Sequence, residues 1–413
     1  MSADATASET AATRGAFGKA SVRDAEVRGR RALVRVDLNV PLGNADGGGR
    51  TVGDDTRIRA ALPTIELLRR RGASLVAVSH LGRPQGRDES LSMAPVAARL
   101  SELLGADVAL APGVVGAEVE REAAALGAGE VLLLENSRFE PGETANDAGL
   151  AERLARLGDL YVNDAFGAAH RAHATTAGVA RLLPACAGLL LEREVRELTA
   201  VRDDPAPPLC VVLGGAKVSD KVGVIERFLA VADRVLIGGA MCFGFFRAQG
   251  LGTGDSLVDD DGVELARRVL ELAERSDCEL WLPSDLVLGE RFDAEAEVRE
   301  LDGVAVPDGW MGLDIGPRTA REYAGAIAEA GTVFWNGPMG AFELGPFAAG
   351  TRAVAEAVAE ARGFTVVGGG DSAAALTAFG LDRRVGWLST GGGASLELME
   401  GRELPGVEAL DDA

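Results

Sequence analysis

Short, almost continuous apolar runs alternate with amphipathic segments along most of the chain, and this alternation constrains the fold more than any other feature. Apolar runs without a polar residue at every second position are typical of parallel strands that are buried on both faces. Parallel neighbours need long crossover connections, which the amphipathic segments supply as helices. The sequence therefore predicts an α/β fold with doubly wound parallel sheets.

The predicted strands and helices fall into two series. Strands of the first series are expected at Ala32–Val36, Ser74–Val78, Val131–Leu134 and Leu160–Val162. Strands of the second are expected at Leu209–Leu213, Val235–Ile237, Leu280–Leu282, Val333–Trp335 and Phe364–Val367. The clearest helices are expected at Ile58–Arg71, Asp147–Leu157, Leu189–Val201, Gly262–Arg275, Thr319–Ala330 and Thr351–Ala361.

The break between the two series marks a domain boundary. The long helical stretch Leu189–Val201 is followed by Pro205-Ala206-Pro207-Pro208, which stops a helix and forms a stiff connector. We therefore expect two doubly wound, Rossmann-like domains joined by a helical hinge, with one domain at 21–204 and the other at 205–405. The Ala/Ser/Thr-rich residues 1–20 are expected to form a flexible lead.

Charge and cysteine content exclude several classes of protein. The net charge of −21 argues against a nucleic-acid binder, which needs a basic surface. No apolar run approaches a membrane span, and the N-terminal residues lack the apolar segment of a secretory signal. The widely spaced cysteines favour neither a disulfide scaffold nor a zinc ribbon, so we expect a reducing, cytoplasmic location. They are Cys186, Cys210, Cys242 and Cys278.

In the first half of the chain, arginine and histidine recur after the predicted strands, at the sheet edge where open α/β sheets bind ligands. A lone arginine is more often paired with a surface carboxylate, but this recurrence favours an anion site. The planar guanidinium suits phosphate and carboxylate. The segments are RVDLNVP (Arg35–Pro41), SHLGRP (Ser79–Pro84), LENSRF (Leu134–Phe139) and VNDAFGAAHRAH (Val162–His173), with Arg57 in the helix-opening segment Asp54–Pro63.

These segments also contain polar residues other than arginine. Asp37 and Asn39 suit hydroxyl groups or hold an arginine in place. His170 and His173 have the spacing of half a metal site, but they lack an H-E-x-x-H frame and nearby cysteines. We therefore expect an anion contact or a hydrogen bond from these histidines, and no metal.

In the second half, glycine replaces arginine after the predicted strands. Glycine lets backbone N–H groups approach phosphate oxygens at the start of a helix, where the helix dipole adds positive charge. In this setting Lys221 could reach a transferring phosphate, and Asp371 could hold Mg²⁺. The segments are LGGAKVSDK (Leu213–Lys221), IGGAM (Ile237–Met241), WNGPMGAFE (Trp335–Glu343), VVGGGDSAAAL (Val366–Leu376) and STGGGASLE (Ser389–Glu397).

The established nucleotide signatures are absent from the sequence. It contains neither G-x-x-x-x-G-K-[ST] nor a G-x-G-x-x-G that follows a strand, which argues against a P-loop enzyme, a protein kinase and a Rossmann dehydrogenase.

The two halves of the chain suit different ligands. The first half, with its recurrent arginines, suits a small anion, and the second half, with its recurrent glycines, suits a nucleotide polyphosphate. This division predicts phosphoryl transfer after closure of a hinge.

In order and spacing, these segments resemble the phosphoglycerate kinase family from about Val34 to Val407. Further matching segments are DTRI (Asp55–Ile58), LPACAGLLLEREV (Leu183–Val195) and MGLDIGP (Met311–Pro317). The resemblance implies reversible in-line phosphoryl transfer between 3-phosphoglycerate with ATP and 1,3-bisphosphoglycerate with ADP, with Mg²⁺ bound as MgATP or MgADP. It also implies a monomer whose tail, 406–413, returns to the first domain.

Carried over by motif, the resemblance assigns residues to two sites. Its catalytic residues are Arg57, Lys221 and Gly370, with Arg57 stabilising and Lys221 guiding the transferring group. The implied 3-phosphoglycerate site is Asp37, Leu38, Asn39, Arg57, His80, Leu81, Gly82, Arg83, Arg138, His170 and Arg171. The implied nucleotide site is Gly214, Lys217, Lys221, Gly238, Gly239, Leu313, Asn336, Pro338, Glu343, Gly369, Gly370, Asp371 and Ser372, with Asp371 as the Mg²⁺ ligand.

The sequence leaves two alternatives open. One is a non-catalytic nucleotide- or phosphate-binding protein, which would be expected to lack Arg57, Lys221 or Asp371, although all three are present. The other is a kinase of a different small molecule.

The acid excess and the scarcity of lysine suggest a halophilic, salt-adapted protein. Only Lys19, Lys217 and Lys221 are lysines. A GC-rich genome would account for the lysine count but not for the acid excess.

Overall fold

The computed structural model describes residues 17–44 and 50–413, which form two compact units. Unit 1 comprises the chain up to Arg196 together with Glu403–Ala413, and unit 2 comprises Glu197–Arg402. The division falls inside helix α5 (Leu189–Asp203), earlier in the chain than the boundary expected at the prolines. Residues 1–16 of the expected lead lie outside the described residues.

The core of unit 1 is a parallel sheet, and its six strands run in the order β5-β6-β4-β1-β7-β8. All five neighbouring pairs are parallel, and Val34 in β1 lies between Ala77 in β4 and Val162 in β7. The strands are β1 (Arg31–Arg35), β4 (Ser74–Val78), β5 (Val108–Leu110), β6 (Val131–Leu133), β7 (Leu160–Asn163) and β8 (Ala185–Ala187).

Helices with apolar faces connect these strands. Ile58, Ile65 and Leu68 of α1 are fully buried and belong to the same core as the strand residues. The connecting helices are α1 (Thr56–Arg70), α2 (Ala94–Leu104), α3 (Ala117–Ala125) and α4 (Ala148–Ala155), and α13 (Pro405–Glu408) lies in the C-terminal segment. A short antiparallel pair, β2 (Leu42–Asn44) and β3 (Arg50–Val52), precedes α1.

The C-terminal segment belongs to unit 1. The Asn163 side-chain amide donates to the Gly406 carbonyl at 2.8 Å, and Gly406 N–H donates to the Ala169 carbonyl at 2.8 Å. Ala20 N–H donates to the Asp411 carbonyl at 2.8 Å, and Lys19 Nζ forms a 2.9 Å ion pair with Asp412. Hydrogen bonds and an ion pair thus link residues near the two ends of the described chain.

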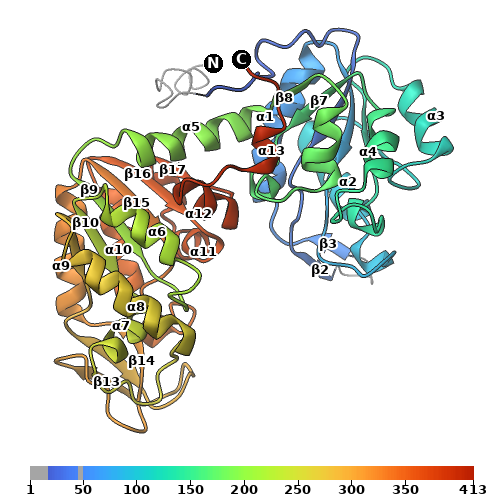
Figure 1. Cartoon of the computed structure of the whole chain (residues 1–413). Coiled ribbons are helices and arrows are strands. Elements are labelled where there is room, and N and C mark those ends of the chain that lie inside the picture. Colours follow the sequence, from blue (N-terminus) through green and yellow to red (C-terminus); the bar gives the residue numbers. More distant parts are fainter. Residues whose placement is uncertain (1–16, 45–49) are drawn as a thin grey trace, which may run out of the picture. The chain divides into compact units, whose positions relative to one another are not determined.

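The core of unit 2 is a second parallel sheet, and its six strands run in the order β11-β10-β9-β15-β16-β17. Figure 1 labels β9, β10, β15, β16 and β17 of this sheet. Central strands β9 and β15 are fully buried, as their apolar runs Leu209–Leu213 and Val333–Trp335 predict. The strands are β9 (Leu209–Leu213), β10 (Arg234–Ile237), β11 (Glu279–Trp281), β15 (Thr332–Asn336), β16 (Phe364–Gly368) and β17 (Trp387–Leu388).

Unit 2 also contains a small antiparallel sheet in the order β13-β12-β14, which the sequence did not predict. Its strands are β12 (Leu286–Gly289), β13 (Val298–Leu301) and β14 (Met311–Ile315). The helices of unit 2 are α6 (Val222–Leu229), α7 (Cys242–Ala248), α8 (Asp260–Ala273), α9 (Pro317–Glu329), α10 (Ala349–Glu360), α11 (Gly370–Ala378) and α12 (Gly393–Met399).

The predicted fold class, two parallel-sheet α/β domains, is confirmed. Each of the nine predicted strands is present, and the ends agree to within about one residue. Among the described residues, no helix is both long enough and apolar enough to span a bilayer.

Candidate active site

In unit 1, the predicted anion-binding side chains surround His80, which follows strand β4. Burial lowers the pKa of His80 well below its ordinary value, and the charges of Arg35, Arg138, Arg171 and Arg57 lower it further. Several guanidinium groups therefore act on one neutral imidazole. This concentration of positive charge at a strand end suits a multiply charged anion.

A buried arginine fixes the tautomer of the neutral His80 ring. Arg35 Nη2 lies 3.0 Å from His80 Nδ1, and Arg35 Nε donates to Thr175 Oγ1 at 2.9 Å. Because a guanidinium can only donate, Nδ1 of the neutral ring must accept and Nε2 must carry the proton. His80 therefore offers an N–H donor from the other side of its ring.

Two polar residues of the RVDLNVP segment hold neighbouring groups in place. Arg57 Nη1 donates to Asp37 Oδ2 at 2.9 Å, and Arg57 remains partly exposed. Asn39 Oδ1 accepts the Gly82 N–H at 2.9 Å. Gly82 has a φ of +61°, a conformation that favours glycine in this turn.

Three of the predicted arginines line one cavity of about 610 Å³. They are Arg83, Arg138 and Arg171, and His173 lines the same cavity. Arg138 Nε is buried without a hydrogen-bond partner among the residues that the structure describes, so a ligand could satisfy it. Arg171 Nε donates to His170 Nε2 at 3.0 Å, which orients the guanidinium.

The two leucines assigned to the 3-phosphoglycerate site are core residues. Leu38 and Leu81 are buried in the core, and their N–H groups donate to Ser79 Oγ and Asn136 Oδ1 at 2.9 and 3.0 Å. These contacts fix the backbone of the two loops that carry Asn39 and His80.

Within the described part of the chain, no three or more His, Cys, Asp or Glu residues are grouped so that they could hold a metal ion. His170 and His173 therefore belong to no such group.

Sequence reasoning missed two buried residues of this site, Arg35 and Asn136. The Asn136 amide donates to the carbonyls of Leu81 and Leu91 at 2.7 and 3.0 Å, and so ties two loops together. The signal for Arg35 was available, because this charged residue directly follows the apolar run Ala32–Val34 of β1. Asn136 gave no such signal, since its contacts depend on the folded loops.

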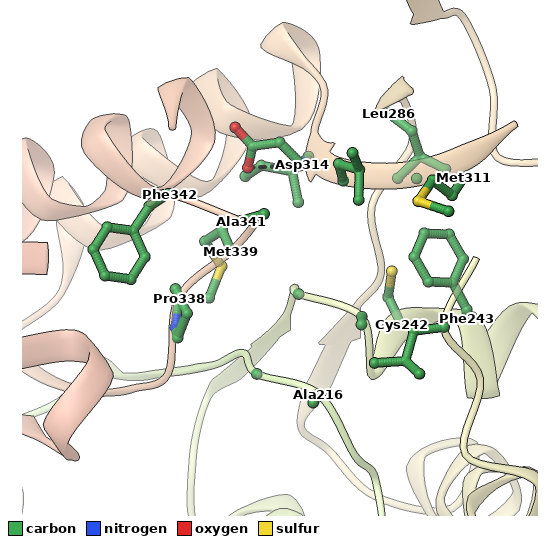
Figure 2. Close-up of a pocket in the computed structure, with 18 of the residues that line it drawn as sticks. Ala216, Cys242, Phe243, Leu286, Met311, Asp314, Pro338, Met339, Ala341 and Phe342 are labelled. Carbon is green, nitrogen blue, oxygen red and sulfur yellow. Dashed lines mark hydrogen bonds between the residues drawn. The ribbon is translucent and has the colours of Figure 1, made fainter. Parts of the chain in front are cut away.

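In unit 2, a pocket of about 750 Å³ lies at the strand ends (Figure 2). Figure 2 shows Phe342 and Phe243 on opposite sides of the pocket, with Pro338 and Met339 on the Phe342 side. Its lining is largely apolar, which suits a flat organic ring. The predicted nucleotide-site residues that line it are Gly239, Leu313, Pro338, Glu343 and Asp371.

Lys221 immediately precedes helix α6 and is buried, with its Nζ beside the end of β9. Its Nζ donates to the Gly214 carbonyl, the Asn336 carbonyl and Asn336 Oδ1 at 2.6, 2.7 and 2.6 Å. Burial lowers its pKa from 10.5 to about 7, and Asp371 and Asp220 raise it only partly. The ammonium therefore lies among oxygen atoms but has little compensating negative charge.

The start of α11 presents polar groups that a phosphate could use. Asn336 Nδ2 is buried without a partner among the described residues, and it lies beside Gly369. Gly370 has open space where a side chain would stand. Ser372 Oγ accepts the Gly337 N–H at 2.6 Å, so its oxygen holds the neighbouring turn.

Other assigned glycines have a packing reason. A Cβ at Gly214 would overlap the Pro338 carbonyl, one at Gly238 would overlap the Met339 sulfur, and Gly239 has a φ of +66°. These glycines let the Pro338–Met339 turn approach the ends of β9 and β10. Lys217, in contrast, is exposed.

Unit 2 has the strand order of a doubly wound, nucleotide-binding α/β domain, and unit 1 has a similar parallel sheet with a basic site at its strand ends. A model of the phosphoglycerate kinase family matches residues 22–402. The chain is 57% identical over 396 residues to phosphoglycerate kinase of Rubrobacter xylanophilus, covering 95% of this chain and 98% of the relative. It is 54% identical over 397 residues to that of Herpetosiphon aurantiacus, covering 96% and 100%.

A solved structure gives the same result. The structure of phosphoglycerate kinase from Coxiella burnetii superposes with a TM-score of 0.85 at 38% identity, covering 95% of this chain and 98% of that one. The chain belongs to the phosphoglycerate kinase family.

Proposed function

We propose that this chain catalyses reversible phosphoryl transfer between ATP and 3-phosphoglycerate, as in glycolysis and gluconeogenesis. The bond between the γ-phosphorus and the ADP oxygen breaks, and a bond from phosphorus to the 3-phosphoglycerate carboxylate oxygen forms. The products are ADP and 1,3-bisphosphoglycerate. Membership of the phosphoglycerate kinase family over residues 22–402 supports this proposal.

The observation that carries the proposal is the chemical difference between the two strand-end sites. In unit 1, arginines surround a histidine that offers an N–H hydrogen-bond donor, which suits the phosphate and carboxylate of 3-phosphoglycerate. In unit 2, an apolar pocket continues to the start of α11, which suits a purine with its phosphates.

Three residues would act on the transferring group. Arg57, oriented by Asp37, would face the charge that develops on the phosphoryl oxygens. Lys221 would follow the same group from the nucleotide side, once it leaves the oxygens that hold it. The backbone N–H of Gly370, at the first turn of α11, would contribute a further hydrogen bond.

The residues of unit 2 fit a magnesium ion that is shared with nucleotide phosphates. Asp371 is an exposed carboxylate in the first turn of α11, and it lines the pocket. A single carboxylate is what Mg²⁺ uses when phosphates and water supply its other ligands. The ion would neutralise part of the phosphate charge, and Asp371 would hold it next to the pocket.

Closure of the chain would precede transfer. The 3-phosphoglycerate residues belong to unit 1 and the nucleotide residues to unit 2, so each substrate alone contacts one unit. We propose that both together stabilise a closed state, in which water is excluded and the phosphoryl group moves in line. We also propose a cytoplasmic monomer.

A coupled assay tests the function directly. Purified protein is given 3-phosphoglycerate and MgATP, and ADP release is followed together with formation of 1,3-bisphosphoglycerate. We expect turnover that requires both substrates. Binding without turnover would favour the non-catalytic alternative, and turnover only with another acceptor would favour a different small-molecule kinase.

A further inference from the structure

Asp314 is a buried carboxyl group in the wall of the nucleotide pocket. It lies in β14, is 4% exposed, and lines the pocket close to the Pro338–Phe342 segment (Figure 2). Its Oδ1 accepts the Ile315 N–H at 2.9 Å, and its Oδ2 accepts the Gly350 N–H at 2.6 Å. Burial raises the pKa of this group to about 8.

Two glycines make room for this carboxyl group. A Cβ at Gly340 or at Gly350 would overlap Asp314 Oδ1. Gly340 belongs to the segment that lines the pocket, and Gly350 lies in the first turn of α10. Asp314 therefore occupies the space that side chains would fill at both positions.

Further hydrogen bonds join the same three elements. Ala341 N–H donates to the Leu313 carbonyl of β14 at 2.8 Å. Met339 and Gly340 donate their N–H groups to Thr351 Oγ1 of α10 at 3.0 and 3.2 Å. The pocket segment is thus held from one side by β14 and from the other by α10, and the Asp314 carboxyl group joins the two.

We propose that Asp314 is a positioning residue for nucleotide binding, which holds the Pro338–Glu343 segment at the separation from β14 that the nucleotide requires. Asp314 acts through its packing against Gly340 of this segment and through the hydrogen bond that it accepts from Gly350. The inference rests on the proposed function, because it takes the pocket to be the nucleotide site.

Asp285 provides a matched control within unit 2. It is 6% exposed, it accepts the Arg318 and Thr319 N–H groups of α9 at 2.9 and 2.8 Å, and a Cβ at Gly316 would overlap it. It therefore repeats the arrangement of Asp314, a buried carboxyl group closed against a glycine and a helix start. It is not among the residues that line the pocket.

The test compares Asp314→Ala with Asp285→Ala. We expect both variants to melt at lower temperature than the parent protein. Only Asp314→Ala should weaken ADP binding in calorimetry and raise the KM for ATP, each by about tenfold, the equivalent of one or two lost hydrogen bonds. Its KM for 3-phosphoglycerate should not change. Asp314→Asn keeps the volume and one acceptor, so it should restore part of the affinity.

Thr351→Val is the second variant, in case Asp314→Ala does not fold. It removes the hydroxyl group that accepts from Met339 and Gly340, and it should raise the KM for ATP in the same direction. Unchanged ADP affinity in folded Asp314→Ala, or in Asp314→Asn and Thr351→Val together, would overturn the inference. Absence of turnover in the unsubstituted protein would overturn the proposed function instead.

Discussion

Arg57 and Arg59 lie two positions apart on α1 but have different partners. Arg57 pairs with Asp37 of the proposed 3-phosphoglycerate site, whereas Arg59 pairs with Asp55 at 2.8 Å and is more exposed. We expect Arg57→Ala to lower kcat by roughly 10³–10⁵-fold, because an arginine that stabilises a transferring phosphoryl group acts mainly on the transition state. Affinity for 3-phosphoglycerate should fall much less.

Arg59→Ala is the matched control for this prediction. An exposed ion pair contributes little to stability, so this variant should retain normal kcat. Steady-state kinetics and calorimetry of both variants provide the comparison. Near-normal turnover of Arg57→Ala would remove Arg57 from the catalytic residues.

The lowered pKa of Lys221 predicts proton uptake when nucleotide binds. At about pH 8.5 the free protein holds Lys221 mostly neutral, because its pKa is about 7. A bound polyphosphate raises that pKa, so the bound state holds more protons than the free state. By linkage, affinity for ADP should then weaken as pH rises above about 7.

Calorimetry in buffers of different ionisation enthalpy measures this uptake. At about pH 8.5, where ADP itself no longer titrates, we expect uptake that approaches one proton per nucleotide. Lys221→Gln should abolish the uptake, and Lys217→Gln, which changes an exposed lysine, should preserve it. Identical apparent enthalpies in all buffers would show that Lys221 keeps its protonation state.

At the scale of elements, the start of α11 is expected to hold the metal through Asp371. Asp371→Ala should bind metal-free ADP almost normally and lose most of the gain in affinity that Mg²⁺ provides. Asp255→Ala changes another exposed carboxylate that lines the same pocket, and it should keep that gain. Calorimetry with and without Mg²⁺ separates the two variants, and an unchanged gain in Asp371→Ala would assign the ion to another group.

The elements differ in how well the sequence predicts them. Long apolar runs such as Leu209–Leu213 are found where expected, because only a buried parallel strand accommodates them. The antiparallel strand Val298–Leu301 was missed, since it is short, largely exposed and rich in charge. Strand β8 (Ala185–Ala187) was missed because its small residues give only a weak strand signal.

The site residues also differ in how well the sequence predicts them. Recurrent arginine and glycine after strands could be recognised, because parallel strands bring their carboxyl ends to one edge. The role of Asp314 could not, because Gly340 and Gly350 come near it only after folding. The roles assigned to individual site residues stay predictions until variants are measured.

At the scale of the whole molecule, the net charge of −21 predicts salt-dependent stability. Repulsion among excess carboxylates destabilises the folded chain in dilute buffer, and salt shortens the Debye length to about 3 Å at 1 M. We expect the melting temperature to rise substantially between low and molar KCl, with most of the rise at the lower concentrations. A melting temperature independent of KCl would favour genome composition as the cause of the scarce lysine.

The same salt series tests how well the basic site is shielded. Exposed ion pairs lose their attraction as salt screens them, whereas charges in a partly desolvated cavity lose less. Affinity for 3-phosphoglycerate should therefore fall only modestly in molar KCl. A steep fall would show that Arg83, Arg138 and Arg171 bind the anion in open solvent.

The central claim is that the basic site of unit 1 and the pocket of unit 2 serve two substrates of one reaction. Small-angle scattering tests it on four samples: the free protein, the protein with 3-phosphoglycerate, with MgADP, and with both ligands. 3-Phosphoglycerate and MgADP cannot react with each other, so the complex with both is stable during the measurement. We predict a clear decrease in the radius of gyration only when both are bound. The full decrease with MgADP alone would contradict this claim. So would an unchanged radius of gyration under conditions in which calorimetry shows that both substrates are bound.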